Sequence, residues 1–153
     1  MSLESDIRTL ERVRLFEGFG AEHLRLLAFG AETKHFEEGE ALYLQGDPAD
    51  EAYVIVDGRV DLITDGAEDK AQSYGPSSLL GELALITPTH RPAKARAARK
   101  TVVLKLSRAL FLRVLNEYPE LAERLHERFS KSVREIVNRL DYVRTRLARA
   151  DHL

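Results

Sequence analysis

The 153-residue chain contains no cysteine, no tryptophan and only one methionine. The absence of cysteine excludes disulfide bonds, thiolate nucleophiles and thiolate metal sites, and it fits a reducing compartment. No apolar run approaches the roughly 20 residues of a membrane-spanning helix, and the N-terminus lacks the apolar segment of a signal peptide. We therefore expect a cytoplasmic protein with no membrane contact. Its length is that of one domain, and we assign residues 1–153 to a single domain.

Charge is divided unevenly along the chain, although the formal net charge is only −2. Residues 1–70 carry 7 basic and 17 acidic side chains, whereas residues 71–153 carry 16 basic and 8 acidic ones. No acidic residue lies between Glu82 and Glu117, an interval that holds eight basic residues. A positive field in this interval would attract a phosphorylated ligand.

The spacing of apolar residues changes from helical to alternating near Lys34 and returns to helical at Ser107. In residues 1–30 the helical spacing predicts two short helices, Leu3–Leu15 and Ala21–Phe29. The alternating part reads as short strands between glycine-centred turns, which is typical of a β-barrel or jelly roll. The predicted strands are Lys34–Phe36, Ala41–Gln45, Ala52–Val56, Arg59–Thr64, Ala93–Ala97 and Thr101–Leu106.

Three turns between these strands contain Gly39, Gly46 and Gly58, which are most simply explained by a need for positive φ. We expect Arg59–Thr64 to pair with Ala52–Val56 as a hairpin. The fold class is therefore α+β, with an eight-stranded jelly-roll-like β-barrel over residues 31–106. Helices precede this barrel in residues 1–30 and follow it in residues 107–153.

Residues 75–97 combine several features that suit a small anion. Gly81 opens a one-turn helical pattern, GELALI, and a second turn is expected over Thr87–His90. A glycine lets the backbone approach a ligand closely, and the first amides of a short helix can donate to an anion. Arg91 lies nine residues after Glu82, and an arginine can hold a phosphate with two parallel hydrogen bonds. The glutamate can accept a hydrogen bond from a sugar hydroxyl.

The string GELALI, with an arginine nine residues after its glutamate, resembles the phosphate-binding cassette of the cyclic nucleotide-binding domain family. This family includes regulatory subunits of cyclic-AMP-dependent kinase and the sensor domains of bacterial catabolite activators. The strings FEEGEALYLQGD and AYVIVDGRVDL are also similar to the glycine-marked turns of the family, so the resemblance covers nearly the whole chain. It implies a cyclic nucleotide ligand and a β-roll flanked by helices.

The resemblance also implies a role for individual residues of the cassette. Arg91 would pair with the cyclic phosphate, and Glu82 would accept a hydrogen bond from the ribose 2′-hydroxyl. Backbone amides of Gly81 and its neighbours would face the ligand. The ligand-binding residues implied in this way are Gly81, Glu82, Leu83, Ala84, Arg91, Pro92 and Ala93.

Two positions depart from the pattern of the family. Pro92 has no N–H to donate to a phosphate, and Ala93 has no hydroxyl to offer to a phosphate or a guanine. We therefore expect weakened affinity, with cyclic AMP favoured over cyclic GMP. The alternative is a dimerising scaffold of the same fold that has lost nucleotide binding.

The C-terminal part predicts a helix over Arg108–Asn116 and a long helix from Tyr118 toward Arg149. Apolar residues in the long helix recur at steps of three and four, close to a heptad seam. One barrel cannot cover such a stripe, so we expect a homodimer. The expected interface residues are Phe129, Val133, Ile136, Leu140, Val143 and Leu147.

Alignment with the bacterial activators implies two further features of the long helix. Their base-contacting pair falls on Ile136 and Val137, which become the candidates for covering the purine. A helix-turn-helix domain follows this helix in the activators, but the present chain reaches Leu153 without one. We therefore expect no DNA-binding domain in this chain, which is either a stand-alone binding module or a piece of a longer regulator.

Enzymatic and nucleic-acid-binding functions are less favoured by the sequence. A jelly-roll enzyme of the cupin type needs paired histidines close together in a strand, and no two of the five histidines lie within ten residues of each other. Nothing resembles a nucleophile elbow or a catalytic triad. Residues 121–149 carry 8 basic and 4 acidic side chains but no groove-reading motif. The expected role is a non-enzymatic, metal-free cyclic-nucleotide sensor that acts through its C-terminal helix.

Overall fold

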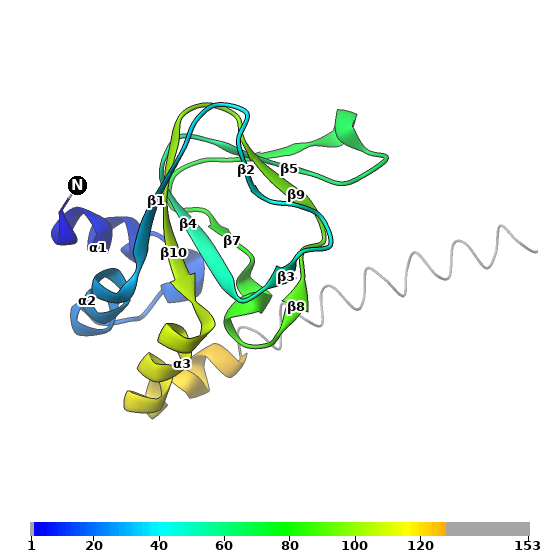
Figure 1. The fold of residues 1–153 in the computed structure, drawn as a ribbon. Helices are drawn as coiled ribbons and strands as arrows, with labels where there is room; N and C mark the ends of the chain where they lie inside the picture. Colours follow the sequence, from blue (N-terminus) through cyan, green and yellow to red (C-terminus); the bar gives the residue numbers. More distant parts are fainter. Residues whose placement is uncertain (1, 128–153) are drawn as a thin grey trace, which may run out of the picture. The chain divides into compact units, whose positions relative to one another are not determined.

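The computed structural model describes residues 2–127, and Figure 1 shows how its helices and strands are arranged. The chain divides into two compact units between Glu117 and Tyr118, and each unit is described by itself. The first unit contains the predicted β-roll with helices before and after it. In the second unit, residues 119–127 are helical. The assignment of residues 1–153 to one domain stays a prediction.

Two α-helices precede the roll, α1 (Leu3–Glu11) and α2 (Ala21–Gly30), and a 3-10 turn, η1 (Arg14–Phe16), lies between them. α1 begins with a capping box in which the side chains of Ser2 and Ser5 each accept the backbone N–H of the other, at 3.2 and 3.0 Å. Both helices contact the sheet that contains β4 and β10, in agreement with the predicted helical lead (Figure 1).

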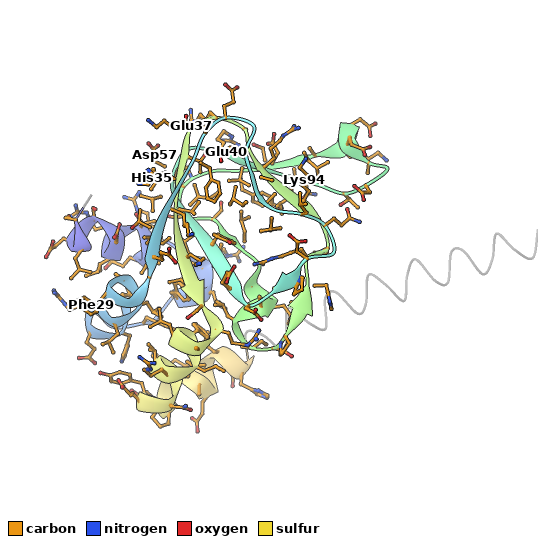
Figure 2. All side chains as sticks on the ribbon, in the orientation of Figure 1. Phe29, His35, Glu37, Glu40, Asp57 and Lys94 are labelled. Atoms are coloured by element: carbon orange, nitrogen blue, oxygen red, sulfur yellow. The ribbon has the colours of Figure 1, made fainter. Side chains whose placement is uncertain are left out.

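The extent of the first helix differs from the prediction. α1 ends at Glu11 rather than at Leu15, because Val13 adopts an extended backbone with φ −74° and ψ 124°. α2 matches the predicted helix over Ala21–Phe29 to within one residue, and its Leu24 and Leu27 are buried. Phe29 of the same helix is 82% exposed, and its side chain lies on the outside of α2 in Figure 2.

Ten strands and two further 3-10 turns lie in the described part of the chain. The 3-10 turns are η2 (Glu68–Lys70) and η3 (Glu82–Leu85). The strands are β1 (Glu32–Phe36), β2 (Ala41–Tyr43), β3 (Pro48–Ala49), β4 (Glu51–Asp57), β5 (Val60–Ile63), β6 (Gln72–Tyr74), β7 (Leu79–Leu80), β8 (Thr89–His90), β9 (Lys94–Ala97) and β10 (Thr101–Ser107).

Eight of these strands form two four-stranded antiparallel sheets with the orders β1-β10-β4-β7 and β2-β9-β5-β6. The two remaining strands, β3 and β8, pair only with each other, so the predicted number of eight misses this short pair. The predicted turn over residues 87–90 is wrong in its second half, because Thr89 and His90 form β8. Their partners are Ala49 and Pro48.

The hydrophobic core lies between the two larger sheets. Tyr53 and Ile55 of β4 and Val103 of β10 enter it from one sheet, and Val60 of β5 and Ala95 of β9 enter it from the other. β4 is buried on both faces between Ala52 and Ile55, since α1 contacts it as well as the core. Burial of one such side chain contributes about 1.5–3 kcal/mol to stability.

The predicted hairpin of β4 and β5 is wrong, because the two strands belong to different sheets. β4 already has β10 on one edge and β7 on the other, whereas β5 pairs with β6 and β9. Gly58 turns the chain from one sheet to the other with φ +106°. The hydroxyl of the buried Thr101 accepts the N–H of Arg59 at 3.2 Å, which fixes this crossing.

α3 (Arg108–Glu117) follows β10 directly and matches the predicted helix over Arg108–Asn116. The Ser107 hydroxyl accepts the N–H of Leu110 at 3.1 Å and caps the first turn. The start of the predicted long helix is observed, since residues 119–127 are helical. The rest of that helix, with all six predicted interface residues, lies outside the described residues. No helix among residues 2–127 is both long and apolar enough to cross a membrane.

Replacing Gly58 with alanine should destabilise the roll more than the same change at Gly39. Gly39 has φ +88° and open space around an added Cβ, so G39A costs only the strain of positive φ, about 1–2 kcal/mol. At Gly58 the added Cβ would overlap Thr101 Oγ1 and lie 2.7 Å from the Lys100 carbonyl oxygen. We expect G58A to cost a further ~1–3 kcal/mol in urea denaturation. Equal losses of unfolding free energy in G58A and G39A would contradict the close packing of Gly58 against Thr101.

Candidate functional site

The candidate site opens at η3, the one-turn helix that the sequence predicts after Gly81. Gly81 has φ +86°, a conformation that glycine adopts without the penalty other residues carry. The Ala84 N–H donates to the Gly81 carbonyl at 3.0 Å and closes the turn. The first N–H groups of such a turn have no partner inside it and can donate to a ligand.

Arg91 is held in place by the short β3–β8 pair, which ends one residue before it. Its N–H donates to the Asp47 carbonyl at 2.8 Å, and its own carbonyl accepts the N–H of Gly46 at 2.8 Å. The backbone of Arg91 is therefore fixed on both sides by the turn at Gly46 and Asp47.

The Arg91 side chain points inward and is only 4% exposed. Its Nη2 donates to the carbonyl oxygen of Glu51 at 2.7 Å. The guanidinium carbon lies 4.2 Å from the ring centroid of Tyr43 and 5.7 Å from that of Tyr53. A guanidinium over an aromatic face is attracted by the ring quadrupole. Two tyrosines and one carbonyl therefore hold the arginine in a single position.

The remaining nitrogens of this guanidinium have no partner within residues 2–127. Among the described residues, Nε and Nη1 of Arg91 are buried without a hydrogen bond. The Nη1 atom lies so close to Gly81 that a Cβ at this glycine would overlap it. Burying a cation without a partner is costly, and a buried donor without an acceptor calls for an explanation. An anion placed beside the Gly81 turn would supply the missing acceptors and the missing charge.

Glu82 follows Gly81 and is half-buried. Its carboxylate forms no hydrogen bond or ion pair with another described residue. Burial raises the pKa of Glu82 above its ordinary value of 4.5, since loss of solvent disfavours the charged form. The Glu82 carboxylate thus has no partner among the described residues, and it follows the glycine that contacts Arg91.

The two tyrosines at Arg91 stay neutral under physiological conditions. Burial is the main cause that raises the pKa of Tyr53 to about 12, and the nearby Glu51 carboxylate adds to it. The Tyr53 hydroxyl donates to Glu51 Oε1 at 3.2 Å. Burial also raises the pKa of Tyr43. Neither ring therefore brings a negative charge to the guanidinium.

The other residues named from the sequence differ in how accessible they are. Leu83 and Pro92 are exposed, whereas Ala84 and Ala93 are buried. Ile136 and Val137, the candidates for covering a base, lie outside the described residues. No group of three or more side chains suited to a metal ion lies within residues 2–127.

Part of the negative charge of the N-terminal half lies far from Arg91. The turn between β1 and β2 is at the end of the roll away from β3 and β8 (Figure 1). Glu37, Glu40 and Asp57 lie at this end (Figure 2). These three acidic side chains therefore do not pair with the guanidinium of Arg91.

Residues 33–118 match the cyclic nucleotide-binding domain family. The chain belongs to this family. The cassette that contains Gly81 and Arg91 lies inside the matched segment, and so do all ten strands except the first residue of β1. The fold and the family predicted from the sequence are thereby confirmed.

Individual relatives show the same likeness. A solved structure of a cyclic nucleotide-binding-like protein from Brucella abortus is 44% identical, with a TM-score of 0.65, and the match covers 72% of this chain and 97% of that one. A cAMP-dependent protein kinase regulatory subunit from Yarrowia lipolytica is 31% identical over 148 residues, 97% of this chain and 39% of the relative. Lysophospholipase nte1 from Aspergillus terreus is 30% identical over 114 residues, 72% of this chain and 8% of the relative. The chain thus spans well under half the length of these two relatives.

Sequence reasoning missed the residues that hold Arg91. Tyr43, Tyr53 and the Glu51 carbonyl come from segments 38–48 positions before the arginine, and no spacing rule links them to it. The alternation of apolar residues could indicate that Tyr53 points inward, but not which residue it contacts. The cassette pattern assigned Gly81 and Arg91 to one ligand, and in the structure these two residues lie against each other.

Proposed function

We propose that this domain is a regulatory sensor that binds a cyclic purine nucleotide, cyclic AMP in preference to cyclic GMP. The observation that carries the proposal is the buried guanidinium of Arg91, whose Nε and Nη1 have no partner among the described residues and whose Nη1 lies against Gly81. A cyclic phosphate carries one negative charge, which matches one arginine. The Glu82 carboxylate is free to accept a hydrogen bond from the ribose.

The preference for cyclic AMP rests on the residues next to the arginine. Ala93 offers no hydroxyl to a guanine, and Pro92 offers no N–H to the phosphate. In the sequence alignment, Ile136 and Val137 would cover the base, and they can pack on a purine without reading its edge. We therefore expect weak discrimination between bases and an affinity that depends mainly on the phosphate.

The second candidate is a dimerising scaffold that has lost nucleotide binding. Pro92 is the observation that favours it, because this position has no amide for the phosphate. The same titration decides between the two candidates, since a scaffold binds neither cyclic AMP nor cyclic GMP. In either case we propose a non-enzymatic protein, and its lack of cysteine fits the cytoplasm.

Replacing Arg91 should remove most of the affinity for cyclic AMP. A hydrogen bond to a charged group contributes about 1.5–3 kcal/mol, so R91A should weaken binding about 10- to 150-fold in calorimetric titration. R91K should restore only part of the affinity, because an ammonium cannot form the paired contact. R96A is the matched control, since Arg96 is an exposed arginine on β9.

Three outcomes separate the possibilities. If R91A binds as tightly as the wild type, the domain keeps its ligand but Arg91 does not hold the phosphate. If the wild type binds neither cyclic purine nucleotide at millimolar concentration, the sensor hypothesis is rejected in favour of the dimerising scaffold. Equal losses in R91A and R96A would point to a general charge effect.

Binding should depend on pH through Glu82. The pKa of this carboxyl is raised by burial, so it gains a proton at a higher pH than an exposed glutamate. Only the ionised form is a full acceptor for a ribose hydroxyl, and the ligand should therefore bind more weakly as the pH falls through that raised pKa. The stability of the free protein depends on Glu82 with the opposite sign, because ionising a buried carboxyl is unfavourable. The contribution of Glu82 to the free energy of unfolding is fully present below pH 4.5 and is lost as the pH rises through the raised pKa.

The E82Q variant tests this dependence because glutamine accepts a hydrogen bond without titrating. Affinities measured by calorimetry from acid to neutral pH should rise in the wild type and stay flat in E82Q. Both proteins should carry H90Q, which removes the exposed histidine next to Arg91. A wild-type profile as flat as that of E82Q would rule out a contact between Glu82 and the ligand.

Action through a dimeric C-terminal helix is the remaining part of the proposal, and it rests on the apolar spacing of residues 129–147. If these side chains form a seam between two chains, L140D places a charge in it and should convert a dimer to a monomer in sedimentation. N138D introduces the same charge at a position that the heptad spacing places on the side of the helix away from the seam, and it should leave the dimer intact. A wild type that sediments as a monomer at high concentration would refute the seam.

A further inference from the structure

Arg108, the first residue of α3, contacts the cassette at the carbonyl end of η3. Its Nη1 donates to the Ala84 carbonyl oxygen at 3.1 Å and lies 3.4 Å from the carbonyl oxygen of Ala49. Its Nη2 donates to Asp50 Oδ1 at 3.1 Å. The backbone N–H of Arg108 donates to the Asp50 carbonyl at 2.9 Å. One residue therefore joins α3, the cassette and the chain just before β4.

The segment Ala49–Glu51 is shared by both arginines. The carbonyls of Ala49 and Asp50 accept from Arg108, and the next carbonyl, that of Glu51, accepts from Arg91 at 2.7 Å. The outer two of these successive carbonyls thus accept from the two guanidinium groups, and the middle one accepts from the backbone of Arg108. A displacement of this segment would move the acceptor that fixes Arg91.

Arg108 also holds the η3 turn from the end opposite to Gly81. Ala84 is fully buried, and its carbonyl lies near the end of the turn, where the last carbonyls of a helix need partners from outside it. A cation near the carbonyl end of a helical turn is electrostatically favourable. Without Arg108 this buried carbonyl would lose a donor, and the turn would have to move toward water.

We propose that Arg108 is a positioning residue of the nucleotide site. It does not contact the ligand, but it fixes the η3 turn and the Glu51 carbonyl, between which the Arg91 guanidinium lies. This inference rests on the proposed function and adds to it a residue that the cassette pattern does not contain. Replacing Arg108 therefore weakens binding of the phosphate, because the distance between Gly81 and the Arg91 guanidinium is no longer fixed.

The ion pair with Asp50 contributes little to this role. The Asp50 side chain is 72% exposed, and an exposed ion pair is screened by water and salt. The buried Ala84 carbonyl is the contact that matters. D50N, which removes the charge of Asp50 but keeps its backbone carbonyl, therefore separates the ion pair from the positioning effect.

The test is a set of cyclic AMP titrations on the wild type and on R108M, R108K, D50N and R113M. R113M is the matched control, because Arg113 is an exposed arginine on the same helix. We expect R108M to bind about ten-fold more weakly, and D50N and R113M to change the affinity less than two-fold. R108K keeps one donor for the Ala84 carbonyl, so its affinity for cyclic AMP should fall only about three-fold. R108K replaces R108M in the test if R108M does not fold.

A double-mutant cycle distinguishes positioning from general destabilisation. If Arg108 acts through Arg91, the ten-fold loss should shrink to less than three-fold when R108M is made in the R91K background. A loss of equal size in both backgrounds would overturn the inference, and so would an R108M affinity equal to that of the wild type. If the wild type itself binds neither cyclic AMP nor cyclic GMP, the proposed function fails and takes this inference with it.

Discussion

The buried guanidinium of Arg91 is the constraint on which the rest of the site depends. A cation that is almost fully buried must be held and must be neutralised, and the protein supplies only the first of these. Two tyrosine rings and the Glu51 carbonyl fix its position, while Nε and Nη1 keep no partner among the described residues. Burying these donors without acceptors is unfavourable, and an anion would supply both the acceptors and the opposite charge.

The surrounding fold explains how such a group is kept in place. The β3–β8 pair fixes the Arg91 backbone, and Gly81 leaves room for Nη1 that any side chain would fill. The two sheets enclose the core from which Tyr53 extends to the arginine. The roll is therefore a rigid frame for one short loop and one arginine, and α3 follows immediately from its last strand. Segments similar to this chain occur within relatives of different length, since the match covers 8% of one relative and 39% of another.

The sequence predicted the elements that a local pattern determines. It did not predict the contacts between segments that lie far apart in the chain. Alternating apolar residues and positive-φ glycines indicated the roll, and the GELALI string indicated the turn beside Arg91. The pairing of β4 with β10 and β7, rather than with β5, depends on contacts far apart in the chain, which a short apolar run does not encode. The two-residue strands β3 and β8 are too short to show alternation. Likewise, nothing near Arg91 or Arg108 in the sequence points to Tyr43 or to the Ala84 carbonyl.

The central claim is that an anionic ligand accepts hydrogen bonds from Nε–H and Nη1–H of Arg91. Nuclear magnetic resonance of ¹⁵N-labelled arginine side chains tests this claim most directly. The Nε–H signal of Arg91 can be assigned by its absence in R91K. Addition of cyclic AMP should shift this signal and slow its exchange with water, whereas adenosine, which lacks the phosphate, should leave it unchanged. An Nε–H signal that does not move at saturating cyclic AMP, or that moves equally with adenosine, would contradict the account.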